Sequence, residues 1–119
     1  MATATLETGV RHSVIFPEIS GQKYGFIHVD LDGVKYLRFS AKAGLSGHPP
    51  IAWKLEDELG LSRDFLFSNG RKGGGMVDVD LEKKELRFYG SSGMFGKYNY
   101  AVLEEVLEEA AEDYGYKFE

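Results

Sequence analysis

His48 is the side chain whose type and position best suit proton transfer in this sequence. It stands directly before Pro49-Pro50, and proline in the first turn is a strong signal for the start of a helix. We therefore expect His48 at the helix N-cap, on the edge of a loop. The positive end of the helix disfavours an imidazolium there, so His48 should be neutral at pH 7 and able to accept a proton. The alternative is a surface loop histidine without a chemical role.

Two glycine-rich segments flank a predicted hairpin and indicate a site for an anion. Apolar residues at 76–81 and 86–89 surround a polar turn at 82–85, which predicts two paired strands. The triplet Gly73-Gly74-Gly75 and the segment Gly90-Ser91-Ser92-Gly93 should then meet at the open end of this hairpin. A helix from about residue 97 would point its free N–H groups at the same place. Glycines, two hydroxyls and a helix N-terminus together suit an oxyanion.

A second hairpin supplies two cations. Strands at 23–31 and 34–41 are joined by Asp32-Gly33, which is a strong two-residue turn signal. The resulting register pairs Ile27 with Arg38 and places Lys23 on the same face. A guanidinium fork and a mobile ammonium group both suit a phosphoryl group. The alternative is that they are two surface cations at strand ends.

Other chemistry has little support in the sequence. There are no cysteines, which excludes disulfides and thiolate nucleophiles and fits a cytoplasmic protein. No two histidines have the spacing of metal ligands, so we expect no metal and no other cofactor. His28 lies inside a strand and is interpreted as structural, and His12 is assigned no role.

Composition and length bound the class of protein. The chain has 119 residues, which predicts one domain at 13–119 after a loose lead-in at 1–12. The net charge of −5 argues against nucleic acid as a partner. The sequence has no long apolar run and no secretion signal, so we expect no membrane contact. We expect a monomer.

The order of predicted elements indicates an α+β fold. Short strands are expected at 13–16, 65–67 and 116–118 besides the two hairpins, and helices at about 49–59 and 97–113. We therefore predict a single domain with a mixed or antiparallel sheet of about six strands and two helices packed on it. The second helix has an apolar stripe and many glutamates, which we interpret as a solvated face. An acidic docking surface is the alternative.

Taken together, these segments resemble the janus/ocnus family, which includes protein-histidine phosphatases. The resemblance covers roughly residues 22–118. It is carried by four segments: KYGFIHV at 23–29, YLR at 36–38, HPPI at 48–51, and GGG, KK and YGSSGMFG between 73 and 96. The first and last align without gaps, whereas the histidine needs short insertions on both sides.

The resemblance implies a metal-free phosphatase that acts on a phosphorylated protein and releases inorganic phosphate. His48 would be the general base that activates water against phosphohistidine or a related phosphoramidate. The implied substrate-binding residues are Lys23, Arg38, Gly75, Ser92, Gly93 and Met94. The alternative is a module of the same fold that binds a phosphoprotein without hydrolysing it.

Three positions depart from the family pattern. Pro49 replaces a residue with a backbone N–H group, and proline has none to donate. Met76 stands where arginine is frequent, and Tyr100 stands where the phosphatase has a histidine. These departures bear on turnover more than on phosphate binding.

Overall fold

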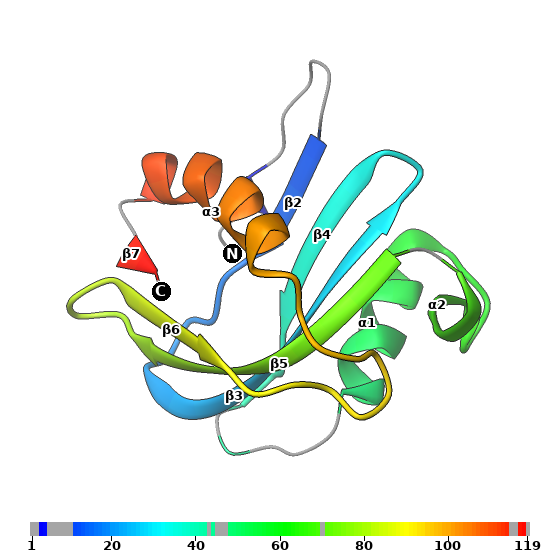
Figure 1. Ribbon diagram of the computed structural model, residues 1–119, viewed down its shortest axis with the longest axis horizontal. Helices are drawn as coiled ribbons and strands as arrows, with labels where there is room; N and C mark the ends of the chain where they lie inside the picture. The colour runs from blue at the N-terminus through cyan, green and yellow to red at the C-terminus, as the bar shows by residue number, and fades with distance from the viewer. Residues whose placement is uncertain are drawn as a thin grey trace.

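The computed structural model describes residues 3–4, 11–42, 44, 48–69, 71–114 and 117–118. In these ranges seven strands form one sheet in the order β1-β2-β4-β3-β5-β6-β7, with helices on both faces (Figure 1). The strands are β1 (Thr3–Ala4), β2 (Arg11–Ile15), β3 (Gly21–Leu31), β4 (Val34–Phe39), β5 (Arg71–Asp80), β6 (Glu85–Tyr89) and β7 (Lys117–Phe118). The helices are α1 (Pro49–Leu59), α2 (Phe65–Ser68) and α3 (Tyr100–Tyr114).

The hairpin of β3 and β4 forms in the predicted register. Asp32 and Gly33 have φ values of 54° and 79°, as a type I′ turn requires at its two central residues. Ile27 pairs with Arg38, and β5 then joins the other edge of β3 in antiparallel orientation. Because β2 is parallel to β4 and β7 is parallel to β6, the sheet is mixed.

Alternating residues of β3 build one core on each face of the sheet. Phe26 packs with Leu103 and Leu107 of α3, whereas its neighbour Ile27 packs with Leu55 of α1. Neighbouring residues on a strand point to opposite faces, so the sheet is buried on both sides. The predicted α+β class is therefore confirmed.

Helix α1 has the bounds that its sequence predicts. It begins at Pro49 and ends at Leu59, and Gly60 closes it with a φ of 69°. The N–H group of Gly60 donates to the carbonyl of Asp57 at 3.3 Å. This left-handed glycine is a common way to end a helix.

The strand predicted at 65–67 is wrong, because these residues belong to the short helix α2. The buried carboxylate of Glu56 accepts hydrogen bonds from the N–H groups of Asp64 and Leu66, at 3.0 and 2.9 Å. Asp64 takes a φ of 67°, which turns the chain before the apolar run. These bonds from α1 fix a turn that the apolar pattern alone does not reveal.

The second long helix begins three residues later than predicted. Asn99 precedes α3, and its side-chain oxygen accepts from the N–H group of Ala101 at 3.0 Å. Asparagine is among the favoured N-caps. The residues between 97 and 99 therefore extend the loop that follows β6.

Part of the N-terminal segment at 1–12 lies within the described residues. Thr3–Ala4 pairs with β2, which already begins at Arg11. His12 is 1% exposed, and residues 5–10 lie outside the described ranges. No helix in the described ranges is long and apolar enough to cross a membrane.

Replacing Gly60 by alanine tests the helix end. An added Cβ would meet no atom within 4 Å, so the cost is the strain of a left-handed alanine alone. We expect a loss of about 1 kcal/mol in the free energy of unfolding in urea. Gly93→Ala is the matched control, since Gly93 also has open space but no positive φ. Equal stability of the two variants would contradict this explanation.

Candidate active site

The glycine triplet lies in the middle of a long strand rather than at the end of a hairpin. Gly73, Gly74 and Gly75 pair with His28, Ile27 and Phe26 of β3. The pairing of β5 with β6 ends one residue beyond the triplet, at Met76 and Tyr89. The chain after β6 then returns across the triplet, and the N–H group of Gly74 donates to the carbonyl of Gly96 at 3.2 Å. The two glycine-rich segments therefore meet, as predicted.

The space beside Gly74 is filled by two side chains of the candidate site. A Cβ at this position would lie 3.2 Å from Cβ of Ser92 and 3.3 Å from Cδ2 of His48. It would also lie 2.7 Å from the carbonyl oxygen of Phe26, a distance that real Cβ atoms do not adopt. The missing side chain of Gly74 thus allows His48 and Ser92 to meet over one point of the strand.

A backbone carbonyl orients His48. The residue is the N-cap of α1 and is 8% exposed. Its Nε2 lies 2.8 Å from the carbonyl oxygen of Gly75. A carbonyl oxygen only accepts, so Nε2 carries a proton and, in the neutral ring, Nδ1 carries the lone pair. Nδ1 has no hydrogen-bond partner among the described residues.

Helix α1 offers few donors to an anion at its start. Pro49 and Pro50 have no N–H groups, and the N–H group of Ile51 donates to the carbonyl of His48 at 3.0 Å. The usual anion site at a helix N-terminus depends on free N–H groups. Among the described residues, the loop after β6 is therefore the nearest further source of backbone donors for a phosphoryl group.

That loop, at residues 90–99, uses most of its donors internally. The Ser92 hydroxyl is buried and accepts from the N–H groups of Met94 at 3.2 Å and Phe95 at 3.0 Å. The N–H group of Ser92 donates to the carbonyl of Gly96 at 3.1 Å. The N–H groups of Ser92 and Met94 are thus engaged, whereas that of Gly93 has no acceptor in the described part of the chain. The hydroxyl proton of Ser92 is a second donor.

Arg38 is not brought to His48. Its Nε and Nη2 donate to the two carboxylate oxygens of Glu58, at 3.1 and 3.0 Å. Its three remaining N–H groups donate to the carbonyls of Ser13 and Leu37 and to the Ser13 hydroxyl. Glu58 lies ten residues after His48 along α1, about 15 Å at the helical rise. Arg38 thus ties α1 to the sheet, and no local pattern in the sequence marked Glu58 as its partner.

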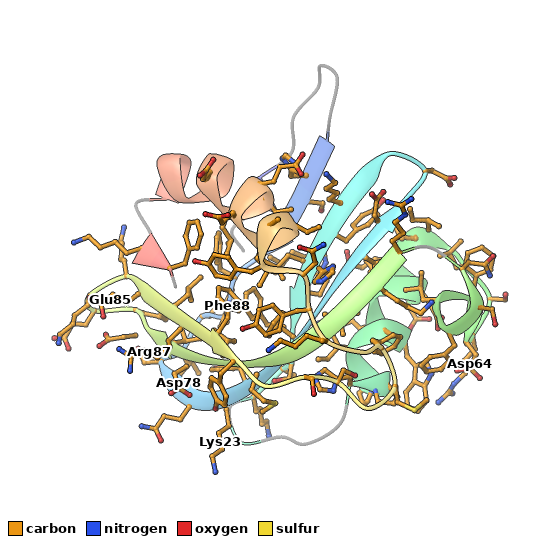
Figure 2. All side chains as sticks on the ribbon, in the orientation of Figure 1. Lys23, Asp64, Asp78, Glu85, Arg87 and Phe88 are labelled. Atoms are coloured by element: carbon orange, nitrogen blue, oxygen red, sulfur yellow. The ribbon has the colours of Figure 1, made fainter. Side chains whose placement is uncertain are left out.

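Lys23 lies near the start of β3, beside the later part of β5. It stands opposite Asp78, which is four residues from Gly74 on β5, or about 13 Å at the rise of a strand. Its side chain is exposed, and Figure 2 shows it extending outward below Asp78. The backbone N–H group of Lys23 donates to the Asp78 carboxylate at 3.0 Å. No local pattern in the sequence marks Asp78 as a partner of Lys23.

His28 anchors the far end of the loop. Its Nε2 accepts a hydrogen bond from the N–H group of Asn99 at 3.0 Å, and the ring packs against Gly73. Burial lowers the pKa of His28 to about 4, so the ring is neutral and accepts at pH 7. His28 is therefore structural, as predicted, and it supports the loop that carries Ser92.

Two hollows on the surface lie elsewhere. One of about 860 Å³ borders the β5–β6 turn, and one of about 310 Å³ lies between residues 15–19 and α1. His48 and Ser92 line neither, although Arg38 lines the smaller one. Among the described residues, no group of three or more histidines and carboxylates could hold a metal ion.

A comparison with known protein families gives one match. The model of the Janus/Ocnus family matches residues 21–115. The chain belongs to this family. No curated protein matches it. In this Janus/Ocnus protein, His48 and Ser92 meet beside Gly74, and Gly93 follows Ser92 in the loop. Arg38 is instead paired with Glu58, and Lys23 lies opposite Asp78.

Gly74→Ala tests the close packing at the site. The new Cβ would collide with the Phe26 carbonyl and press on His48 and Ser92. We expect a loss of about 1–3 kcal/mol in the free energy of unfolding, measured in urea. Chemical shifts should change at both His48 and Ser92. Unchanged stability and unchanged shifts at these residues would contradict the packing described.

The buried His28 predicts a dependence of stability on pH. Its pKa is about 4 when folded and 6.5 when exposed, so the unfolded chain binds more protons between these values. The free energy of unfolding should therefore have its full value above pH 6.5. It should decrease by up to about 3 kcal/mol as the pH drops towards 4. His28→Gln keeps an acceptor for Asn99 but does not titrate, so its urea midpoint should change less between pH 7 and 5. An identical dependence in both proteins would contradict this origin.

Proposed function

We propose that this protein hydrolyses phosphohistidine, or a related phosphoramidate, on a protein substrate without a metal ion. Membership of the Janus/Ocnus family supports the proposal, as does the meeting of His48 and Ser92 beside Gly74, with the free amide of Gly93 next in the loop. The substrate would be a phosphorylated protein and the product inorganic phosphate. Action as a monomer in the cytoplasm is part of the same proposal.

The observation that carries the proposal is the hydrogen bond from His48 Nε2 to the Gly75 carbonyl, at 2.8 Å. It fixes the tautomer and orients the ring, and it leaves Nδ1 as the proton acceptor. A general base needs both an available lone pair and a fixed direction. A surface histidine without a function would not need a buried carbonyl partner.

The proposed reaction is a single displacement at phosphorus. His48 Nδ1 takes a proton from water while the water oxygen bonds to phosphorus and the P–N bond breaks. The leaving imidazole nitrogen takes up a proton from solvent, and phosphate is released without a covalent enzyme intermediate. His48 then returns its extra proton to solvent. The Gly93 N–H group and the Ser92 hydroxyl would stabilise the phosphoryl oxygens in the transition state.

The two cations have different parts in this proposal. Lys23 is exposed and would contribute positive charge from the edge of the site. Arg38 would contribute only if its guanidinium exchanged Glu58 for a phosphoryl oxygen, since all its donors are engaged. Gly75 acts through its carbonyl on His48, and Met94 through the turn that shapes Ser92 and Gly93.

Two substitutions of His48 test the general base. His48→Ala and His48→Gln should lower kcat for a phosphohistidine peptide by about 10²–10⁴-fold, as expected for loss of a general base. Glutamine can still donate to the Gly75 carbonyl, so its loss of activity would not be a packing effect. The wild-type rate should be unchanged in EDTA. Full activity of either variant would refute the proposed role of His48.

A phosphate-binding module is the second candidate, and the engagement of Arg38 favours it. With Arg38 paired to Glu58 and an uncharged Met76 in β5, little positive charge is left to stabilise a transition state. Phosphate-dependent chemical-shift changes at Ser92 and Lys23, without hydrolysis by the wild type, would support this candidate over the phosphatase.

A further inference from the structure

The loop at residues 90–99 is fixed to the sheet where it returns to β5. Lys97 forms an isolated parallel bridge with Gly74, in the middle of the glycine triplet. The carbonyl oxygen of Gly96, directly before it, accepts from the N–H groups of both Gly74 and Ser92, at 3.2 and 3.1 Å. The returning part of the loop is therefore bound both to the strand and to the residue whose hydroxyl belongs to the candidate site.

The outgoing part of the loop depends on a single side chain. Gly90 follows the last residue of β6 and has a φ of 73°, a left-handed conformation that turns the chain away from the strand. Its carbonyl oxygen accepts from the ammonium group of Lys97 at 2.9 Å. In the described part of the chain, this is the hydrogen bond that holds residues 90–91. The side chain of Lys97 thus joins the two ends of the loop across seven positions.

An aromatic ring supports the ammonium group from below. Nζ of Lys97 lies 4.3 Å from the centroid of the Tyr98 ring, and a cation over an aromatic face is attracted to it. The ring itself is packed, with its centroid 5.3 Å from that of Phe26 in the core. Its Cδ1 lies where a Cβ on Gly75 would approach to 2.9 Å. An exposed lysine side chain is costly to order, and here two contacts order it.

We propose that Lys97 is a positioning residue, which closes the loop and so holds the Ser92 hydroxyl and the Gly93 amide in place for a phosphoryl oxygen. This inference rests on the proposed function and adds a residue that acts without touching the substrate. Donors that are already in place stabilise a transition state without the cost of rearranging them. Without the link to Gly90, the glycines of the loop allow other conformations in which these donors are displaced.

Three substitutions separate positioning from charge and from stability. Lys97→Met keeps an unbranched apolar stem but cannot donate to the Gly90 carbonyl. Lys97→Arg keeps a cationic donor that can reach the same carbonyl and lie over the Tyr98 ring. Lys83→Met is the matched control, because Lys83 is also exposed but lies in the turn at the other end of β6. Circular dichroism should show each variant folded under the conditions of the assay.

Steady-state kinetics with a phosphohistidine peptide give the first readout. Lys97→Met should lower kcat about tenfold, since a hydrogen bond to a charged group changes an equilibrium by about that factor. Lys97→Arg should restore kcat to within about twofold of the wild type, and Lys83→Met should not change it. A wild-type kcat in Lys97→Met, or an equal loss in Lys97→Arg, would overturn the inference.

Amide hydrogen exchange gives a readout that does not need hydrolysis. The N–H groups of Ser92 and Phe95 are hydrogen-bonded within the loop, so their exchange reports how often the loop opens. Exchange at both should be about tenfold faster in Lys97→Met than in the wild type or in Lys97→Arg, while exchange within α1 should not change. Equal exchange in the wild type and Lys97→Met would overturn the inference, whatever the hydrolysis assay shows.

Titration with inorganic phosphate separates this inference from the proposed function. Phosphate should shift the NMR signals of Ser92 and Gly93 in the wild type, and Lys97→Met should bind it about tenfold more weakly. If the wild type binds phosphate in this way without hydrolysing the peptide, the proposed function fails and the inference stands. If the wild type hydrolyses the peptide but the two proteins bind phosphate equally, or neither binds it, the inference fails and the proposed function stands.

Discussion

The three glycines in the middle of β5 allow neighbouring groups to approach this strand more closely than a side chain would permit. On one face His28 and the backbone of residues 97–98 approach Gly73, and on the other His48 and Ser92 approach Gly74. A Cβ added to Gly73 or Gly74 would lie 2.7–3.3 Å from each of these groups. The absence of side chains here therefore allows the helix that carries His48 and the loop that carries Ser92 to pack closely on the strand.

This convergence gives the candidate site its particular composition. Its groups are a histidine oriented by a backbone carbonyl, a buried hydroxyl and one free amide, whereas the charged groups lie outside it. The guanidinium group of Arg38 bonds Glu58 near the other end of α1. The backbone N–H group of Lys23 bonds Asp78 on β5. Placing cations at the edge keeps the core of the site free of buried charge, which is costly unless it is paired.

Much of the fold follows from local patterns. Asp32-Gly33 specified a hairpin and its register, Pro49-Pro50 and Gly60 specified both ends of α1, and two-residue alternation placed Phe26 and Ile27 on opposite faces. The strand predicted from the apolar run at 65–67 is wrong, because strand and helix patterns are alike over three residues. Hydrogen bonds to Glu56 stabilise the helix instead. The start of α3 moved from Lys97 to Tyr100 because Asn99 caps it, a signal that residue type alone could have given.

The elements and the types of residue that converge follow from local patterns in the sequence, because turns, caps and alternation are properties of neighbouring residues. The same patterns also place the two glycine segments together, since the order of strands in a hairpin allows one arrangement. Three features are visible only in the folded chain: the free ring nitrogen of His48, the pairing of Arg38 with Glu58, and the hydrogen bond from the Lys23 backbone to Asp78. These features depend on hydrogen bonds between residues 20 to 55 positions apart along the chain. Local sequence patterns do not predict such bonds.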